Sequence, residues 1–267
     1  MKTPTAMHFA DNYLLNPTNP IPVALIGAGG TGSHMLTALA KMNHSLVALG
    51  HAGLQVNCYD GDAVTTANQG RQLFAEAELG LPKAVALINR NNRFFGTNWK
   101  AIPERFCSAN LKVLPNHGKA TLYISCVDTV SARFDIASVL KGFADNSHWE
   151  RNKSLYWMDL GNARHTGQVF LSTIGKIPQP NSNRYKTVSH LPMITDEFSA
   201  LLVAQNDTDA PSCSLAEALQ KQDLFINSTL ANMGASLLWK LFREGMTEHR
   251  GFFLNLANFK SEPILVG

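Results

Sequence analysis

The chain has 267 residues, of which 45% are hydrophobic, so it is long enough to bury one large core. Lysine and arginine exceed aspartate and glutamate by only three (23 against 20) with no basic run, so a nucleic-acid partner is not expected. The first twenty residues are polar, no apolar run is long enough to cross a bilayer, and the four cysteines form no C-x-x-C pair. These features predict a reduced, cytoplasmic protein without a membrane span, a disulfide scaffold or a structural zinc site.

Strand-like and helix-like segments alternate through the first half of the chain. The pattern predicts strands over residues 21–27, 54–60, 99–106 and 120–126, and helices over residues 31–49, 72–78, 83–95 and 130–143. Such alternation indicates a Rossmann-like α/β fold, in which a mostly parallel sheet is flanked by helices.

The pattern changes after residue 150. Residues 154–160 and 167–173 read as two strands with a short connection, which predicts an antiparallel extension of the sheet. Residues 174–212 are rich in Pro, Asn, Ser and Asp and predict a long, mobile crossover segment. A helix is expected over residues 215–243, and the C-terminal tail is expected to frame a sheet edge. We interpret residues 1–267 as one domain, with a nucleotide-binding half over 21–150 and a second half over 151–267.

A glycine turn follows the first predicted strand. Gly27, Gly29 and Gly32 fit the spacing G-x-G-x-x-G, with Gly30 between them. Such a turn between a strand and a helix lets the backbone approach nucleotide phosphates at the helix N-terminus. The spacing alone does not distinguish a dinucleotide such as NAD from ATP.

Acidic residues follow the second predicted strand. Asp60 closes that strand, where a carboxylate can hold ribose hydroxyls in either nucleotide class, although it can also cap a turn. Asp62 follows two residues later, and it suits either the nucleotide site or a solvated turn.

Two cations and an amide make ATP the more probable nucleotide. A triphosphate under attack at its α-phosphate develops negative charge that fixed cations stabilise, whereas the pyrophosphate of NAD is already neutralised by the helix terminus. Arg71 and Lys83 suit that role, with Asn68 as a neutral donor, although each alone is more often a surface residue.

Asp128 supplies a candidate metal ligand. It lies just past the strand predicted over residues 120–126, and Mg²⁺ binds through one or two carboxylates together with substrate phosphates. The same residue can instead cap the helix that begins near Val130.

Together these motifs resemble the adenylating domain of the ThiF-like and ubiquitin-activating enzyme family. The resemblance lies in GAGGTGS at 27–33, in D-x-D and NQGRQ within 60–72, in GLPKA at 80–84 and in CVD at 126–128. More narrowly, the chain resembles the ThiF-related proteins of the PRTRC cassette, which is found on plasmids and other mobile elements.

The resemblance implies ATP- and Mg²⁺-dependent adenylation of the C-terminal carboxylate of a small ubiquitin-like or sulfur-carrier-like protein with a Gly-Gly-like tail. It implies a homodimer, as is common in the family, and a crossover segment that covers the partner's tail. The roles that it assigns are as follows: Asp60 holds the ribose, Asn68 and Arg71 hold the phosphates, Lys83 holds the α-phosphate, Asp128 holds the metal, and Gly27, Gly29, Gly30 and Gly32 admit the nucleotide.

The sequence departs from the family in two places. No arginine precedes Arg71, so the N-terminal arginine that reaches the neighbouring subunit's site in sulfur-carrier relatives is absent or replaced. The paired C-x-x-C zinc motif of many relatives is also missing. A non-catalytic member that binds ATP and a ubiquitin-like protein, and an NAD(P)-dependent oxidoreductase, therefore remain alternatives.

Cys213, in the stretch P-S-C-S, lies where ubiquitin-activating relatives carry the cysteine that captures the activated tail as a thioester. A helix N-terminus would favour its thiolate. The alternative is an ordinary small residue at a helix start.

Overall fold

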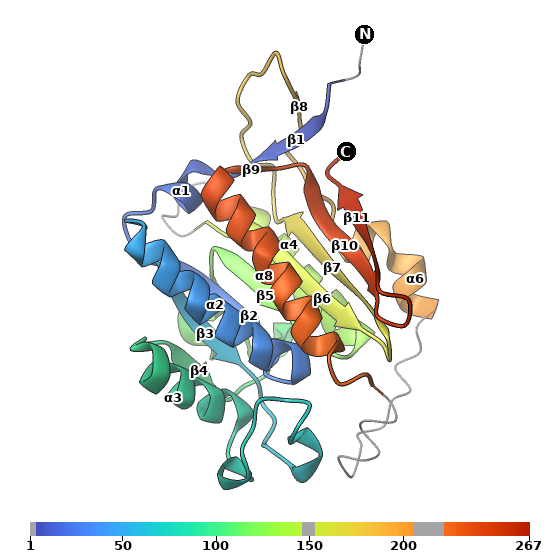
Figure 1. Cartoon of the computed structure of the whole chain (residues 1–267). Coiled ribbons are helices and arrows are strands. Elements are labelled where there is room, and N and C mark those ends of the chain that lie inside the picture. Colours follow the sequence, from blue (N-terminus) through green and yellow to red (C-terminus); the bar gives the residue numbers. More distant parts are fainter. Residues whose placement is uncertain (1–3, 146–152, 205–221) are drawn as a thin grey trace.

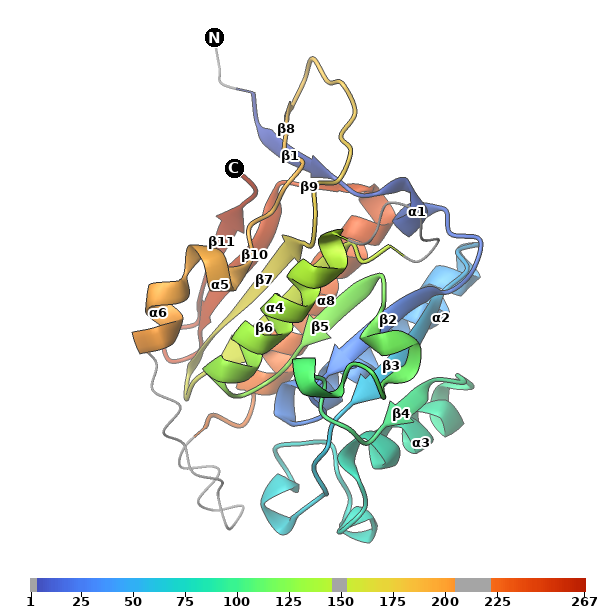
Figure 2. The ribbon, with the colours of Figure 1, turned by 180° about the vertical axis from the view of Figure 1, so that it is seen from behind.

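The computed structural model describes residues 4–145, 153–204 and 222–267, and its centre is an eight-stranded sheet with helices on both faces (Figures 1 and 2). The strand order is β11-β10-β7-β6-β5-β2-β3-β4. Strands β2 to β6 run parallel, and β7, β10 and β11 extend the sheet in antiparallel fashion. This architecture confirms the predicted fold class.

The strands of the large sheet are β2 (Ile21–Ile26), β3 (Leu54–Tyr59), β4 (Lys100–Ile102), β5 (Leu122–Ser125), β6 (Tyr156–Asn162), β7 (Thr166–Thr173), β10 (His249–Asn255) and β11 (Lys260–Leu265). The helices are α1 (Asn12–Leu15), α2 (Gly30–Ala48), α3 (Lys83–Phe95), α4 (Val130–Asp145), α5 (Ile194–Glu197), α6 (Ser199–Ala204) and α8 (Ile226–Glu244). A small second sheet joins β1 (Ala6–Phe9), β8 (Lys186–Thr187) and β9 (Met246–Thr247) in the order β8-β1-β9. Within the described part of the chain, no helix is both long and apolar enough to cross a membrane.

Strand β2 shows why the sheet is buried on both faces. Its residues Ile21, Val23 and Leu25 belong to the apolar cluster shared with α2 and α8, whereas Ala24 and Ile26 belong to the cluster shared with α4. Helices α2, α3 and α8 lie over the face seen in Figure 1, and α4, α5 and α6 lie over the opposite face in Figure 2. The almost wholly apolar sequence of this strand is therefore required by both layers.

The crossover segment is more ordered in the structure than its composition predicts. Its described part contains β8, which pairs with β1, and the two short helices α5 and α6. The small sheet thus ties the N-terminal strand to the crossover segment and to β9. Pairing between strands 180 residues apart carries no signal in local composition, which is why the sequence did not reveal it.

Two other predicted elements are shorter than expected. The strand predicted over 99–106 ends at Ile102, because Pro103 has no backbone N–H for the ladder. The helix predicted over 72–78 is only a 3₁₀ turn, Glu76–Glu78. Its first residues form a tight turn instead, in which the Phe74 amide donates to the Gln72 carbonyl (2.9 Å).

The C-terminal half also differs in part from the prediction. Helix α8 begins at Ile226, and residues 215–221 of the predicted helix lie outside the described residues. Strand β11 forms the outer edge of the sheet, as expected of the tail. Strands β1 and β10 were not predicted.

Candidate functional site

The glycine turn lies between the carboxyl end of β2 and the first turn of α2. Gly27 has a φ of +94°, and a Cβ atom there would lie 2.7 Å from the Cys126 carbonyl oxygen. A Cβ on Gly32 would lie 1.9 Å from the Gly27 carbonyl oxygen. Both positions therefore require glycine for the chain to turn.

The other two glycines have different surroundings. A Cβ on Gly30 would lie 2.6 Å from the side chain of Asn227, so Gly30 permits contact between α2 and α8. A Cβ on Gly29 would meet no atom of the described chain within 4 Å. Gly29, at the N-cap of α2, is thus the glycine that borders open space.

Asp60 ties the glycine turn to the end of β3. Its Oδ2 accepts a hydrogen bond from the Ala28 amide at 2.6 Å, and its Oδ1 accepts one from the Asp62 amide at 2.8 Å. Burial raises the pKa of Asp60, while these two hydrogen bonds and the nearby Lys83 ammonium lower it. The carboxylate is therefore held in one orientation beside the turn.

Lys83, the first residue of α3, is largely buried and reaches the same edge. Its Nζ lies 3.2 Å from Asp62 Oδ2, and its backbone amide donates to the Asp62 carbonyl at 2.9 Å. Arg105 approaches the other oxygen of Asp62 at 3.5 Å. Asp62 is accordingly the counterion of Lys83 rather than a residue that only faces solvent.

Asn68 stabilises its own turn. Its Oδ1 accepts hydrogen bonds from the Thr65 amide (2.8 Å) and the Thr65 hydroxyl (3.1 Å). The Asn68 carbonyl in turn accepts from the Gln72 amide (3.0 Å), which shapes the loop that carries Arg71. Because its oxygen is engaged, Asn68 can offer a ligand only its Nδ2.

Arg71 is half-buried and lies near Asp128. Burial lowers the pKa of Arg71, and the Asp128 carboxylate raises it, so the two charges interact. Arg71 Nη1 donates to Gln222 Oε1 at 2.9 Å, and its buried Nε has no hydrogen-bond partner among the described residues.

Asp128 itself is exposed at the carboxyl end of β5. The hydroxyl of Thr129 accepts a hydrogen bond from the Ala132 amide (3.3 Å) at the start of α4. Thr129 thus fills the capping role that the sequence alone left open for Asp128.

A buried network supports the loop that carries Asp128. Arg133 Nε pairs with Asp159 Oδ2 at 3.1 Å, and Arg133 Nη2 donates to the Val127 carbonyl at 2.7 Å. The Ser125 hydroxyl donates to the other oxygen of Asp159 at 2.6 Å. Arg133 and Asp159 were missed from the sequence, although an acid inside the apolar stretch SLYWMDL is a usable signal for a buried ion pair.

The site also contains amides that the sequence did not indicate. Asn227, in the first turn of α8, accepts a hydrogen bond from the Thr31 hydroxyl (2.9 Å) and donates to Gln222 Oε1 (2.9 Å). Asn162, at the end of β6, has a buried Nδ2 without a partner in the described part of the chain. Single amides at the ends of distant elements show no recognisable spacing, so no motif identified them.

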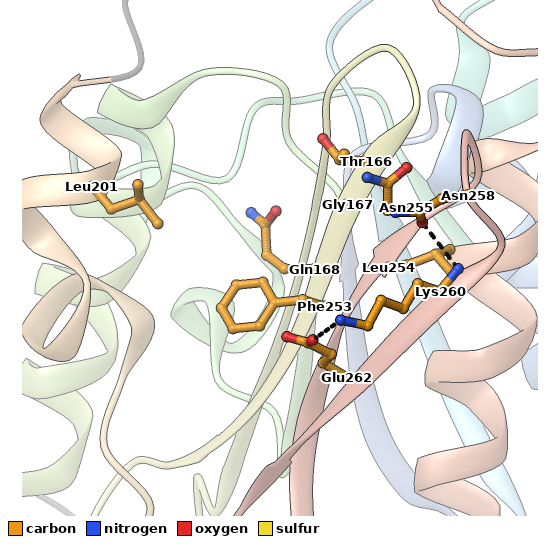
Figure 3. Close-up of a pocket in the computed structure, with 10 residues that line it drawn as sticks. All are labelled: Thr166, Gly167, Gln168, Leu201, Phe253, Leu254, Asn255, Asn258, Lys260 and Glu262. Atoms are coloured by element: carbon orange, nitrogen blue, oxygen red, sulfur yellow. Dashed lines mark hydrogen bonds and ion pairs between the residues drawn. The ribbon is translucent and has the colours of Figure 1, made fainter.

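A groove of about 400 Å³ opens between α6 and strands β7, β10 and β11 (Figure 3). Phe253, Leu201 and Gln168 extend into it, and a Lys260–Glu262 ion pair of 2.5 Å borders it (Figure 3). Thr166 and Gly167 place one end of this groove beside the β6–β7 hairpin. It contains none of the predicted site residues.

Cys213 lies outside the described residues, so its thioester role stays a prediction. Among the residues that the structure describes, no three His, Cys, Asp or Glu side chains cluster as a metal site. The lone, exposed carboxylate of Asp128 nevertheless suits Mg²⁺, which takes most of its ligands from water and substrate phosphates.

The ThiF family model matches residues 18–263. The fold is similar to that of E. coli MccB, at 16% identity and a TM-score of 0.58 over 95% of this chain and 64% of MccB. It is also similar to PaaA, at 18% identity and a TM-score of 0.58 over 92% of this chain and 64% of PaaA. A structure of MccB with ATP gives a TM-score of 0.57 at 15% identity, over 95% of this chain and 65% of MccB.

The chain thus spans slightly less than two thirds of the length of these neighbours, and at such identities the likeness is one of fold. No curated protein matches it in sequence. The family match over most of the chain and the residues assembled around the glycine turn lead to one conclusion: the chain belongs to the ThiF family.

Proposed function

We propose that this protein adenylates a carboxylate at the expense of ATP. The observation that carries the proposal is that Arg71, Lys83 and Asp128 share one sheet edge with the glycine turn. Arg71 interacts electrostatically with Asp128, and Lys83 interacts with Asp60 beside the turn. Membership of the ThiF family and the likeness to a fold solved with ATP support the same activity.

The reaction would proceed by in-line displacement. A carboxylate oxygen of the substrate attacks the α-phosphorus, the bond from that phosphorus to the bridging oxygen breaks, and pyrophosphate leaves with the electron pair. Arg71 and Lys83 would stabilise the charge that accumulates on the α-phosphate and the leaving group. The amides at the start of α2 would bind phosphate oxygens, and Asp60 would hold the ribose.

Mg²⁺ fits this edge because it needs a carboxylate that faces the phosphates, and Asp128 is such a residue. When bound, the ion supplies charge neutralisation to the phosphates. The chain's own contribution is to fix Asp128 through the hydrogen bond from Arg133 to the Val127 carbonyl.

The substrate class is the finer part of the proposal. We propose the C-terminal carboxylate of a small ubiquitin-like or sulfur-carrier-like protein, as the motif resemblance implies. Among the similar structures is MccB solved with MccA, so a neighbour of this fold has been crystallised with a second molecule. A homodimer, the narrower resemblance to PRTRC proteins and transfer of the activated tail to Cys213 stay predictions.

Calorimetric titration of the purified protein with ATP and Mg²⁺, and separately with NAD, tests the proposal. We expect saturable binding of ATP, weakened in Asp128→Ala, and no binding of NAD. The matched control is Asp196→Ala, which removes an exposed carboxylate paired with Lys141 on the α4–α5 side. Binding of NAD with indifference to ATP would overturn the proposal in favour of an oxidoreductase.

A further inference from the structure

Arg71 is held by an amide from a distant part of the chain. Its Nη1 donates to Oε1 of Gln222, which lies in the turn before α8, 151 residues away in sequence. The same oxygen accepts a second hydrogen bond, from Asn227 Nδ2, and both bonds measure 2.9 Å. We propose that Gln222 is a positioning residue that aims Arg71 at the phosphates of ATP, an inference that rests on the proposed function.

A neutral acceptor suits this task better than a carboxylate. Asp128 already attracts Arg71, so an unrestrained guanidinium would fold onto that carboxylate and neutralise it. The Gln222 oxygen provides a competing hydrogen bond without a compensating charge. Arg71 therefore keeps its full positive charge for a phosphate, and its unpartnered Nε remains as a donor.

Gln222 is itself fixed relative to the phosphate-binding helix. Asn227, its donor, accepts a hydrogen bond from the Thr31 hydroxyl in the first turn of α2 (2.9 Å). Asn227 also packs so closely on Gly30 that no Cβ fits between them. The position of Arg71 is thus referred to the same helix terminus that would bind the phosphates.

The backbone beside Gln222 is anchored from the other side. The Asp223 amide donates to the Arg164 carbonyl in the β6–β7 hairpin at 2.8 Å, and Asp223 lies 3.7 Å from His165. The turn before α8 is therefore attached to the antiparallel extension as well as to α2. This arrangement connects the second half of the chain to a cation of the nucleotide-binding half.

A double-mutant cycle in ATP affinity tests the proposal. Arg71→Ala, Gln222→Leu and the double variant are titrated calorimetrically with ATP and Mg²⁺. We expect Arg71→Ala to weaken binding about 30-fold and Gln222→Leu about 10-fold, within the range for hydrogen bonds to charged groups. If Gln222 acts through Arg71, the double variant loses no more than Arg71→Ala alone.

The controls separate the possible failures. Gln55→Leu, which removes a glutamine bonded to the Asn98 carbonyl on β3, should leave ATP affinity unchanged. Gln222→Ala replaces Gln222→Leu if the latter does not fold. Losses that multiply in the double variant would overturn the positioning role while leaving the proposed function intact. A wild-type protein that binds no ATP would instead overturn the proposed function, and this inference with it.

Discussion

Two ion pairs near the carboxyl edge of the sheet differ in their surroundings. Arg133 and Asp159, beneath the edge between α4 and β6, have side chains only 5% and 1% exposed, and further hydrogen bonds satisfy both. Lys83 and Asp62, at the rim between β3 and α3, have side chains 11% and 53% exposed. The buried pair has no access to a ligand, whereas the rim pair can exchange its partner for one.

This difference shows that the burial of the partner, not the presence of charge, separates a supporting pair from a candidate binding pair. A buried charge whose partner is removed is left without solvation, and the fold bears the cost. A rim pair is solvated on one side, so its loss costs the fold little and changes ligand binding instead.

The largest effect is expected at the buried pair. Arg133→Leu leaves the Asp159 carboxylate buried beside Ser125 alone among its former charged and hydroxyl partners. The free energy of unfolding, measured by urea denaturation, should fall by about 3–5 kcal/mol. Lys141→Leu, which breaks an exposed pair with Asp196, is the control and should cost no more than about 1 kcal/mol. Equal losses in the two variants would contradict the comparison.

The second effect is expected at the rim, in binding rather than stability. Lys83→Met keeps the apolar stem of the lysine and removes its charge. ATP affinity should fall about 10- to 100-fold, because a charge-assisted hydrogen bond to phosphate is lost. The free energy of unfolding should change by about 1 kcal/mol or less, since Asp62 remains solvated. A stability loss as large as that of Arg133→Leu would place Lys83 among the supporting residues.

The third prediction separates two glycines of one turn. Gly29→Ala introduces a methyl group into open space, at a φ of −75° that alanine can adopt. The melting temperature should therefore hardly change, while ATP affinity falls roughly tenfold because the methyl group occupies ligand space. Gly32→Ala is the contrasting variant, and it should lose stability because its Cβ would collide with the Gly27 carbonyl. Unchanged ATP affinity in Gly29→Ala would remove that glycine from the site.

The parallel half of the fold could be predicted because its signals are local. Helix α3 has the predicted bounds, and α2 begins one residue before its predicted start, since the glycine turn and apolar periodicity mark both. The small sheet of β1, β8 and β9 could not be predicted, because short strands paired across the chain have no local pattern.

The candidate site divides along the same line. Asp60, Arg71, Lys83 and Asp128 were identified because each follows a recognisable strand or motif. Gln222 and Asn227 were not, since their importance arises only when α8 packs against α2. Sequence reasoning also treated Asn68 simply as a donor, although its oxygen is used by Thr65.

His8 extends the comparison to a buried polar group far from the candidate site. It is fully buried on β1, where its ring nitrogens lie 2.6 Å from the Val188 carbonyl and 2.9 Å from the Tyr156 hydroxyl. A carbonyl only accepts, so Nδ1 carries the proton and the neutral Nε2 accepts from Tyr156. These contacts connect β1 to the crossover segment and to the start of β6.

The smallest effect, a pH dependence of stability, is expected from His8. Burial lowers the pKa of His8, and the hydrogen bond to Val188 opposes that shift only in part. Because the folded pKa lies below the unfolded value of about 6.5, the unfolded chain binds more protons, and stability falls as the pH decreases below that value. Urea denaturation between pH 8 and pH 5 should therefore show a smaller decline in His8→Gln than in the wild type. His34, whose pKa burial also lowers, contributes in the same direction, so His34→Gln measures its share. ATP affinity at pH 8 should be the same in His8→Gln and the wild type, because a buried polar group at this end of the sheet affects only the fold; a decline with pH that persists unchanged in His8→Gln would refute the assignment.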